Sequence, residues 1–200
     1  ESILEVPLAI TAFTEADLER SAINALEDLA QFTPSLQFQD VNGAFQNPSI
    51  RGLTQTDQSS PQGNVGVFID GVYLNNRSGL EFGLLDMERI EVVKGPQSSL
   101  YGRNTFGGAI NYVTKQPTLG EFGGRLEGTF GTRDRQSLAG NINIPIGDVI
   151  SLQVFGGFSD FGGTIPNVRD GNRLGGWSTR DVFGGKLYAE PTEDTRITLF

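Results

Sequence analysis

The stretch that decides the fold covers residues 88–115 and reads ERIEVVKGPQSSLYGRNTFGGAINYVTK. Residues 89–94 interleave β-branched side chains with charges, a pattern that predicts a strand. Gly95 and Pro96 should end this strand, because proline has a fixed φ and no backbone donor. Residues 109–115 alternate between apolar and polar side chains and predict a second strand.

Between these strands the sequence predicts a compact corner. Residues 97–101 fit about one helical turn, and Gly102 can take the left-handed position that ends it. Residues 103–106 are expected to form a loop, and Gly107 and Gly108 would let two backbones approach closely. Taken alone, this succession fits a structural corner in any α/β domain.

The amino-acid sequence of this stretch is more specific than its predicted secondary structure. It resembles the end of the plug domain of TonB-dependent outer-membrane receptors, which carry an ERIEVVKGP-like strand and corner, then a YG…GGxIN-like segment leading into the barrel. Three further segments resemble the family in its own order: VPLAITAFTEAD at 6–17, SIRGL at 49–53 and VGVFIDGVY at 65–73. The resemblance covers residues 5–117, and the remainder looks like the start of the barrel.

The composition narrows the class of protein. The chain has 200 residues, enough for one or two domains, and its 27 glycines favour β structure with tight turns. It contains neither cysteine nor histidine, which excludes a disulfide framework, a zinc site built on these residues and a Ser-His-Asp triad from this segment. The net charge of −9 argues against nucleic-acid binding.

The ends of the sequence lead us to expect part of a longer protein. It begins with an acidic residue and no initiator methionine, carries no signal peptide, and stops within the alternating run ITLF at 197–200. No stretch approaches about 18 consecutive apolar residues, so we expect no transmembrane helix.

The first half of the sequence predicts an α+β arrangement. Strands are expected at 6–13, 36–41 and 49–53, with a hairpin at 65–74. Its two-residue turn would be Asp70-Gly71. Thr14 and Asp17 predict a capping box for a helix at 17–22, and a second helix would follow Asn24. Loops are expected at 42–47, 54–64 and 75–82, and a helical turn at 84–87.

After a linker at 116–118 the pattern changes to alternating segments of about ten residues, the length of a membrane-spanning strand. They lie at 122–130, 138–146, 150–154, 183–190 and 197–199. Tight turns at 147–148 and 191–194 and a long connection at 161–179 fit the two sides of an outer-membrane barrel; the short connection at 132–135 departs from this. A soluble antiparallel sheet is the alternative.

We therefore predict an α+β plug domain at 1–117, followed at 118–200 by antiparallel strands of a transmembrane β-barrel. The barrel would be incomplete, with about five of an expected 22 strands. Open sheet edges are not tolerated in lipid, so further strands would have to close it.

Two cations stand out, Arg51 and Lys94. Each lies in a strand or at its end, in an apolar context where a lone charge is costly. The resemblance implies that both face the barrel wall and pair with barrel glutamates beyond residue 200. The family often has arginine at the position of Lys94. Lysine keeps the charge but cannot form the two parallel hydrogen bonds to a carboxylate that arginine forms. Alternatively, both point to solvent at strand ends.

The resemblance also implies a substrate-facing surface on the plug loops. The candidates there are Phe45, Gln55, Gln58, Asn76 and Arg77, which could equally be ordinary loop residues. The family recruits the energy-transducing protein TonB through a short segment, the TonB box, which would lie upstream of residue 1.

The sequence favours no enzyme. Glu88 with Glu91, or Asp160 with Asp170, match a glycosidase pair only in residue type, because nothing fixes their separation. Neither a dinucleotide fingerprint nor a nucleophile elbow is present. We expect no catalytic residues, no cofactor and no metal.

The resemblance implies energised import of a scarce, bulky ligand across the outer membrane of a Gram-negative bacterium. The plug would lie on the periplasmic side of the barrel lumen and gate it, and the partners would be TonB, a small-molecule ligand and outer-membrane lipid. Ferric siderophores are the family's commonest ligands; cobalamin, haem and oligosaccharides remain open. The alternative is a soluble β-rich ligand-binding or adhesin module.

Overall fold

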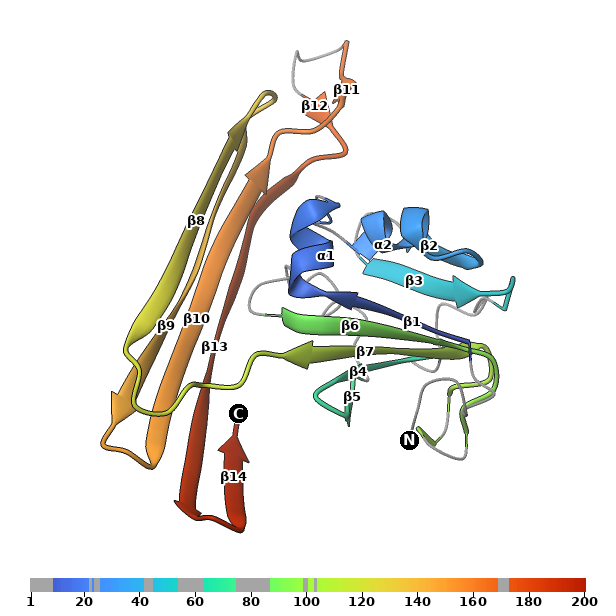
Figure 1. Ribbon diagram of the computed structural model, residues 1–200. Helices are drawn as coiled ribbons and strands as arrows, with labels where there is room; N and C mark the ends of the chain where they lie inside the picture. Colours follow the sequence, from blue (N-terminus) through green and yellow to red (C-terminus); the bar gives the residue numbers. More distant parts are fainter. Residues whose placement is uncertain are drawn as a thin grey trace. The chain divides into compact units, whose positions relative to one another are not determined.

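The computed structural model describes residues 9–21, 23, 26–41, 45–53, 63–74, 87–98, 101–102, 104–168 and 173–200. The chain divides into two compact units, Glu1–Thr114 and Lys115–Phe200, which we call the first and the second unit (Figure 1). Among the described residues, no helix is long and apolar enough to cross a membrane.

The first unit is built on a mixed sheet of five strands in the order β1-β6-β7-β4-β5. Its strands are β1 (Ala9–Thr14), β6 (Met87–Lys94), β7 (Gly108–Thr114), β4 (Val65–Ile69) and β5 (Val72–Tyr73). β4 runs parallel to β7, and the other neighbours are antiparallel. The strands predicted at 89–94 and 109–115 are confirmed and pair with each other. Met87 belongs to β6 rather than to the helical turn predicted at 84–87.

Two short helices and a hairpin lie on one face of this sheet (Figure 1). They are α1 (Glu15–Arg20), α2 (Leu26–Phe32), and β2 (Leu36–Val41) paired with β3 (Phe45–Ile50). The predicted capping box is confirmed: the Asp17 amide donates to the Thr14 hydroxyl at 3.3 Å, and the Thr14 amide donates to the Asp17 carboxylate at 3.1 Å. The helix begins two residues earlier than predicted, because Thr14 is its cap.

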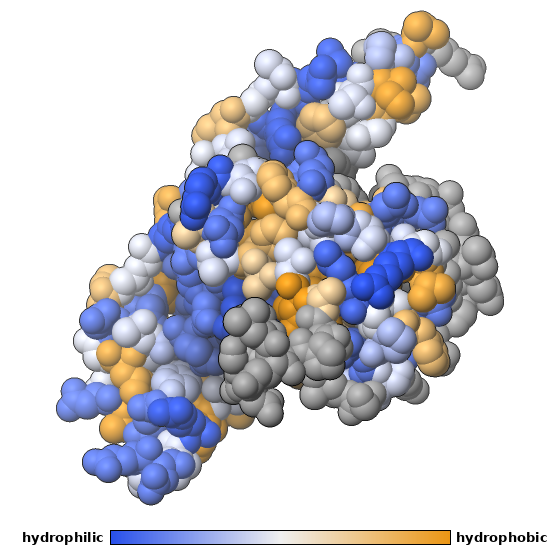
Figure 2. Space-filling view, turned by 45° about the vertical axis from the view of Figure 1, so that its right-hand side comes forward, coloured by the Kyte–Doolittle hydropathy of each residue, from blue (hydrophilic) through white to orange (hydrophobic). Residues whose placement is uncertain are grey.

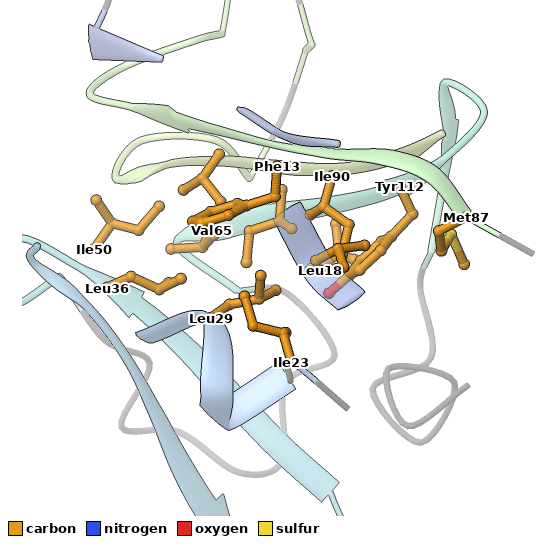
Figure 3. Packing of buried hydrophobic residues seen from close by; sticks show 13 residues of the cluster. Phe13, Leu18, Ile23, Leu29, Leu36, Ile50, Val65, Met87, Ile90 and Tyr112 are labelled. Carbon is orange, nitrogen blue, oxygen red and sulfur yellow. The ribbon is translucent and has the colours of Figure 1, made fainter. Parts of the chain in front are cut away.

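The core of the first unit lies between the sheet and this helical layer (Figure 3). Ile90, Val92 and Ile110 come from the two central strands, Leu29 from α2 and Ile50 from β3, and all five side chains are fully buried. Alternate residues of β6 and β7 supply the core, which is the period of two expected for a sheet covered on one face.

The β2–β3 hairpin corrects two predictions. The loop predicted at 42–47 is wrong at its end, because Phe45 already begins β3. The strand predicted at 49–53 ends at Ile50, and Leu53 forms only a single bridge back to Ile50. Pro48 obscured the strand, but a proline is tolerated in an edge strand, where some amides have no ladder partner.

The second unit is an antiparallel sheet of five strands in the order β14-β13-β10-β9-β8. The strands are β8 (Gly123–Gly131), β9 (Arg135–Ile146), β10 (Ile150–Phe161), β13 (Trp177–Thr192) and β14 (Thr195–Leu199). β10 and β13 are longer than predicted. In β10 the glycine pair at 156–157 interrupts the apolar alternation, and β13 begins at Trp177, inside the long connection predicted at 161–179.

A small hairpin, β11 (Ile165–Pro166) with β12 (Arg173–Leu174), lies in the connection from β10 to β13. Ile165 and Leu174 are exposed, and Figure 2 shows hydrophobic side chains on the surface of this hairpin. The Gly162 amide at its base donates to the Arg133 carbonyl of the β8–β9 turn at 2.9 Å. The long connection is therefore tied to the neighbouring turn.

Candidate functional site

Arg51 lies in a tight turn directly after β3. The Leu53 amide closes the turn on the Ile50 carbonyl at 3.1 Å, and both central residues have positive φ, +54° at Arg51 and +76° at Gly52. The Arg51 amide donates to the Ser35 carbonyl at 2.9 Å, which ties the turn to the start of β2. A left-handed conformation costs a non-glycine residue about 1 kcal/mol. The chain therefore keeps an exposed cation in a conformation that favours glycine.

Lys94 is the last residue of β6 and lies close to this turn. Gly95 follows it with a φ of +102°, and Pro96 then leaves the sheet. A Cβ on Gly95 would lie only 3.6 Å from Arg51 Nη1, so the guanidinium of Arg51 lies against the backbone that follows Lys94. The structure thus brings the two predicted cations to one end of the sheet. We call Arg51 and Lys94 the cationic end.

Two glycines allow the backbones to meet behind the cationic end. A Cβ on Gly108 would lie 2.3 Å from the Val93 carbonyl oxygen and 2.8 Å from Ile50 Cδ1, so no side chain fits there. The Gly95 amide donates to the Gly107 carbonyl at 3.0 Å, which closes the corner between β6 and β7. The close approach predicted at Gly107 and Gly108 is confirmed.

Residues 99–100 of the helical turn predicted at 97–101 lie outside the described residues, but a backbone hydrogen bond joins its two ends. The Tyr101 amide donates to the Gln97 carbonyl at 2.8 Å, and Gly102 follows with a φ of +80°. The Gln97 amide donates to the Thr105 carbonyl at 2.9 Å, which ties the start of this corner to the segment before β7. The Tyr101 ring packs on Phe68 with centroids 4.9 Å apart, and burial raises the pKa of the Tyr101 phenol.

Asp70 and Gly71 form the predicted turn between β4 and β5. Their φ values of +48° and +80° are the pair of left-handed conformations that a type I′ turn requires. The Asp70 carboxylate also reaches the end of β7, where it accepts hydrogen bonds from the Thr114 amide at 2.8 Å and the Thr114 hydroxyl at 2.5 Å. Sequence reasoning missed this contact, because nothing in the pattern aligns β4 with β7.

The charges of the ERIE segment form a cluster of their own. Arg89 donates to Glu91 at 2.8 Å and also contacts Glu88, while Asn111 Nδ2 donates to Glu91 at 3.1 Å. The hydrogen bond with Glu91 raises the pKa of Arg89. These charges are therefore paired within the first unit. By contrast, none of the carboxylates that the structure describes forms an ion pair with the cationic end.

The predicted ligand surface is only partly visible. Gln55, Gln58, Asn76 and Arg77 lie outside the described residues. Phe45 lies at the start of β3, paired opposite Val41, and not in a loop. Within the described part of the chain, no three acidic side chains gather into a group that could hold a metal ion.

The two faces of the second unit's sheet have the opposite polarity from a water-soluble protein. Leu126, Phe130 and Phe183 are 76%, 84% and 88% exposed. On the other face, Gln153 pairs with Lys186 across β10 and β13, and both are almost completely buried. The exposed face is therefore apolar, and the face that carries Gln153 and Lys186 is polar.

Comparison with known proteins places the first unit. Residues 2–109 match the family model described as the TonB-dependent receptor plug domain. The chain belongs to the TonB-dependent receptors. Both residues of the cationic end and the glycine corner fall within the part that matches the plug domain, and the match ends inside β7.

The relatives are larger receptors of this family. The pesticin receptors of Yersinia enterocolitica and Yersinia pestis are 28% identical over 177 residues, which is 88% of this chain and 25% of theirs. The chain therefore spans about a quarter of the length of these curated relatives.

Two solved receptors share the fold. The ferric yersiniabactin uptake receptor of Yersinia pestis matches with a TM-score of 0.80 at 27% identity, over 93% of this chain and 29% of that one. The ferripyoverdine receptor of the outer membrane of Pseudomonas aeruginosa matches with a TM-score of 0.78 at 20% identity, over 99% of this chain and 25% of that one. The second likeness concerns the fold alone.

Proposed function

We propose that the chain is the plug domain and the first barrel strands of a receptor that imports a ferric siderophore across the outer membrane, energised through TonB. One combination carries the proposal: a first unit of the plug family, followed by a sheet with its apolar face outward and its polar face inward. Barrel strands in a membrane have this polarity, because one face meets lipid and the other meets the lumen. A soluble binding module would bury the apolar face.

The relatives support the ligand class. Three solved receptors similar to this chain are a ferric yersiniabactin uptake receptor, a ferripyoverdine receptor and a ferric enterobactin receptor. All three ligands are bulky iron chelates, which need a gated passage rather than an open pore. The residues would supply binding and gating, without covalent catalysis. By resemblance to the family, Gln55, Gln58, Asn76 and Arg77 in the plug loops, together with Phe45, would face the ligand.

We assign the cationic end to the contact between plug and barrel. Arg51 is exposed in a strained turn, and strain retained in a small turn often marks a functional side chain. Both residues carry a positive charge at the same end of the sheet, so acidic partners on a barrel wall would stabilise both. Pairing of this kind would hold the plug until TonB, bound at a box upstream, pulls on it.

Import is tested in a strain that lacks the receptor gene, complemented with the full-length protein. The probes are radio-iron complexes of yersiniabactin, pyoverdine and enterobactin, with and without a protonophore and in a strain lacking TonB. We expect one chelate to enter, and only in energised cells with TonB. Failure of all three to enter, or entry that is indifferent to TonB, would overturn the proposal.

The cationic end is tested with Arg51→Ala, Lys94→Ala and the double variant. Arg20→Ala is the matched control, since Arg20 is an exposed arginine of the same unit, paired locally with Asp17. We expect altered energised uptake in the first three variants and normal uptake in the control, with equal receptor levels in the outer membrane. Normal uptake in the double variant would remove the cationic end from the gating machinery.

A further inference from the structure

The segment from Lys115 to Glu121, which we call the strap, is fastened to the polar face of the second unit's sheet. Lys186 Nζ on β13 donates to the Lys115 carbonyl at 2.9 Å. Asn143 Nδ2 on β9 donates to the Thr118 carbonyl at 2.8 Å and to the Glu121 carbonyl at 2.6 Å. Two side chains from different strands therefore hold three carbonyls of the strap.

The strand register makes these two fasteners part of one row. Gln153 on β10 is the opposite partner of both Asn143 and Lys186, so the three side chains share one face at one height of the sheet. The Ser151 hydroxyl donates to Asn143 Oδ1 at 2.9 Å, and this bond turns the Asn143 amide nitrogen toward the strap. The Ser151 bond thus helps to orient the Asn143 amide within the row.

A buried lysine such as Lys186 is an unusual residue to hold the strap. It is 1% exposed, and its ammonium lies 5.1 Å from the centroid of the Phe200 ring. A buried ammonium is costly unless its hydrogen bonds are made. The bond to the Lys115 carbonyl is charge-assisted and correspondingly strong.

On the other side of the same peptide bond, Thr114 is held by the first unit. The Asp70 carboxylate binds both its amide and its hydroxyl. Consecutive residues are therefore fastened to different units, Thr114 to the hairpin turn of the plug and Lys115 to the sheet. The division of the chain into its two compact units falls at this peptide bond.

We propose that the strap is a fixed anchor, so that any movement of the plug during import ends at Thr114 while residues 115–121 stay on the sheet. The inference rests on the proposed import function, which supplies the movement. Asn143 and Lys186 act as positioning residues: they set where the moving part of the chain stops. Without them, a pull on the plug would be transmitted to β8 and would separate this strand from β9.

The first test needs no import. Amide hydrogen exchange is measured on the purified full-length receptor carrying Asn143→Ala or Lys186→Met. Asn141→Ala is the matched control, because Asn141 lies two residues away on the same strand face and accepts from the Arg125 amide of β8. We expect the strap amides to exchange about tenfold faster in the first two variants and unchanged in the control. Unchanged exchange in both variants would overturn the anchor.

The second test follows the boundary during transport. The sequence has no cysteine, so single cysteines are placed at Ala109 on β7 and at Leu119 in the strap. Energised cells supplied with ferric yersiniabactin are treated with a maleimide, with and without a protonophore. We expect energy-dependent labelling at position 109 and none at 119. In the Asn143→Ala background, labelling at position 119 becomes energy-dependent too.

Three outcomes separate this inference from the proposed function. Equal labelling at 109 and 119 in the otherwise unchanged receptor overturns the anchor, and so does iron entry without labelling at 109. If no chelate enters although the strap exchange responds as expected, the import function fails and the static fastening stands. If Lys186→Met does not reach the membrane, Asn143→Ala alone decides.

Discussion

The carboxylate of Asp70 binds both polar groups of Thr114, a residue 44 positions further along the chain. Asp70 can do so because its left-handed conformation in the hairpin turn directs the side chain toward the parallel neighbour strand β7. A turn residue therefore fixes the last residue of the plug sheet.

Thr114→Val should weaken this end of β7. The substitution keeps the shape and removes the hydroxyl donor to a carboxylate, a type of bond worth about 1.5–3 kcal/mol. Hydrogen exchange of the β7 amides in the full-length receptor should report the loss as faster opening. Thr118→Val, at an exposed position, is the control and should change nothing. Equal opening of β7 in both variants would contradict the role of the Asp70–Thr114 pair.

Gly108→Ala should be far more damaging than Gly102→Ala. Both glycines have positive φ, but a Cβ at 108 would strike Val93 and Ile50, whereas a Cβ at 102 meets nothing within 4 Å. We expect about 1 kcal/mol of destabilisation at Gly102 from the backbone alone. Gly108→Ala should add a further loss of about 1–3 kcal/mol from overpacking. Thermal unfolding of the two variants measures the difference, and similar melting temperatures would be inconsistent with the close approach.

Arg51→Asn should separate folding from gating. Asparagine adopts the left-handed conformation more readily than arginine, so the turn should be kept or stabilised by up to about 1 kcal/mol. Energised uptake should nevertheless fall, because the charge is lost. Arg51→Lys, which restores a cation in the strained turn, should recover part of the uptake. Full uptake by Arg51→Asn would argue that the turn itself, and not the charge, is what the protein needs.

The capping box should give a pH-dependent contribution to stability. Two hydrogen bonds from Thr14 lower the pKa of Asp17 below the ordinary value of 3.8. The bond from the hydroxyl has the larger effect and the bond from the amide the smaller. Because the folded pKa is lowered, the stabilisation is complete above that ordinary value and is lost as the pH falls through the lowered one. The advantage of the unchanged protein over Asp17→Asn should therefore shrink on acidification in this window. An advantage independent of pH would contradict the assignment.

Leu126→Lys should block assembly of the second unit in a membrane. Its outward position, opposite Gly140 on β9, would put a charge against lipid, which costs about 2–4 kcal/mol near the midplane of a bilayer. Glu127→Lys, one residue further on the same strand, places a charge on the other face and should be tolerated. The heat-modifiable electrophoretic mobility of the full-length receptor shows whether each of the two variants has assembled. Normal assembly of Leu126→Lys would argue against a lipid-facing surface.

Local chemistry made much of the fold predictable. The strands at 89–94 and 109–115, the Asp70-Gly71 turn and the capping box at Thr14 each depend on residues close together in the sequence. The start of β3, before residue 49, was missed because Pro48 hides a strand that needs few ladder bonds. The full length of β10 was missed because glycines at 156–157 carry no polarity signal.

The candidate site was only partly predictable. Arg51 and Lys94 were identified as isolated cations, but no local pattern in the sequence shows that the Arg51 guanidinium lies against Gly95, the residue after Lys94. The fastening of the strap was not predicted at all. Alternation assigns Asn143 and Lys186 each to a polar face, yet only the register of three strands brings them into one row.

The order of the plug sheet also affects how the protein is made. β1 is synthesised before β6, which is its neighbour in the described sheet, and Ala9 pairs with Lys94. Until Lys94 has emerged from the ribosome, this strand has no partner among the described strands. During this interval the nascent chain exposes an unpaired strand edge, which can pair wrongly with other chains. A chaperone that binds unfolded chains would therefore be most useful between the synthesis of β1 and that of β6.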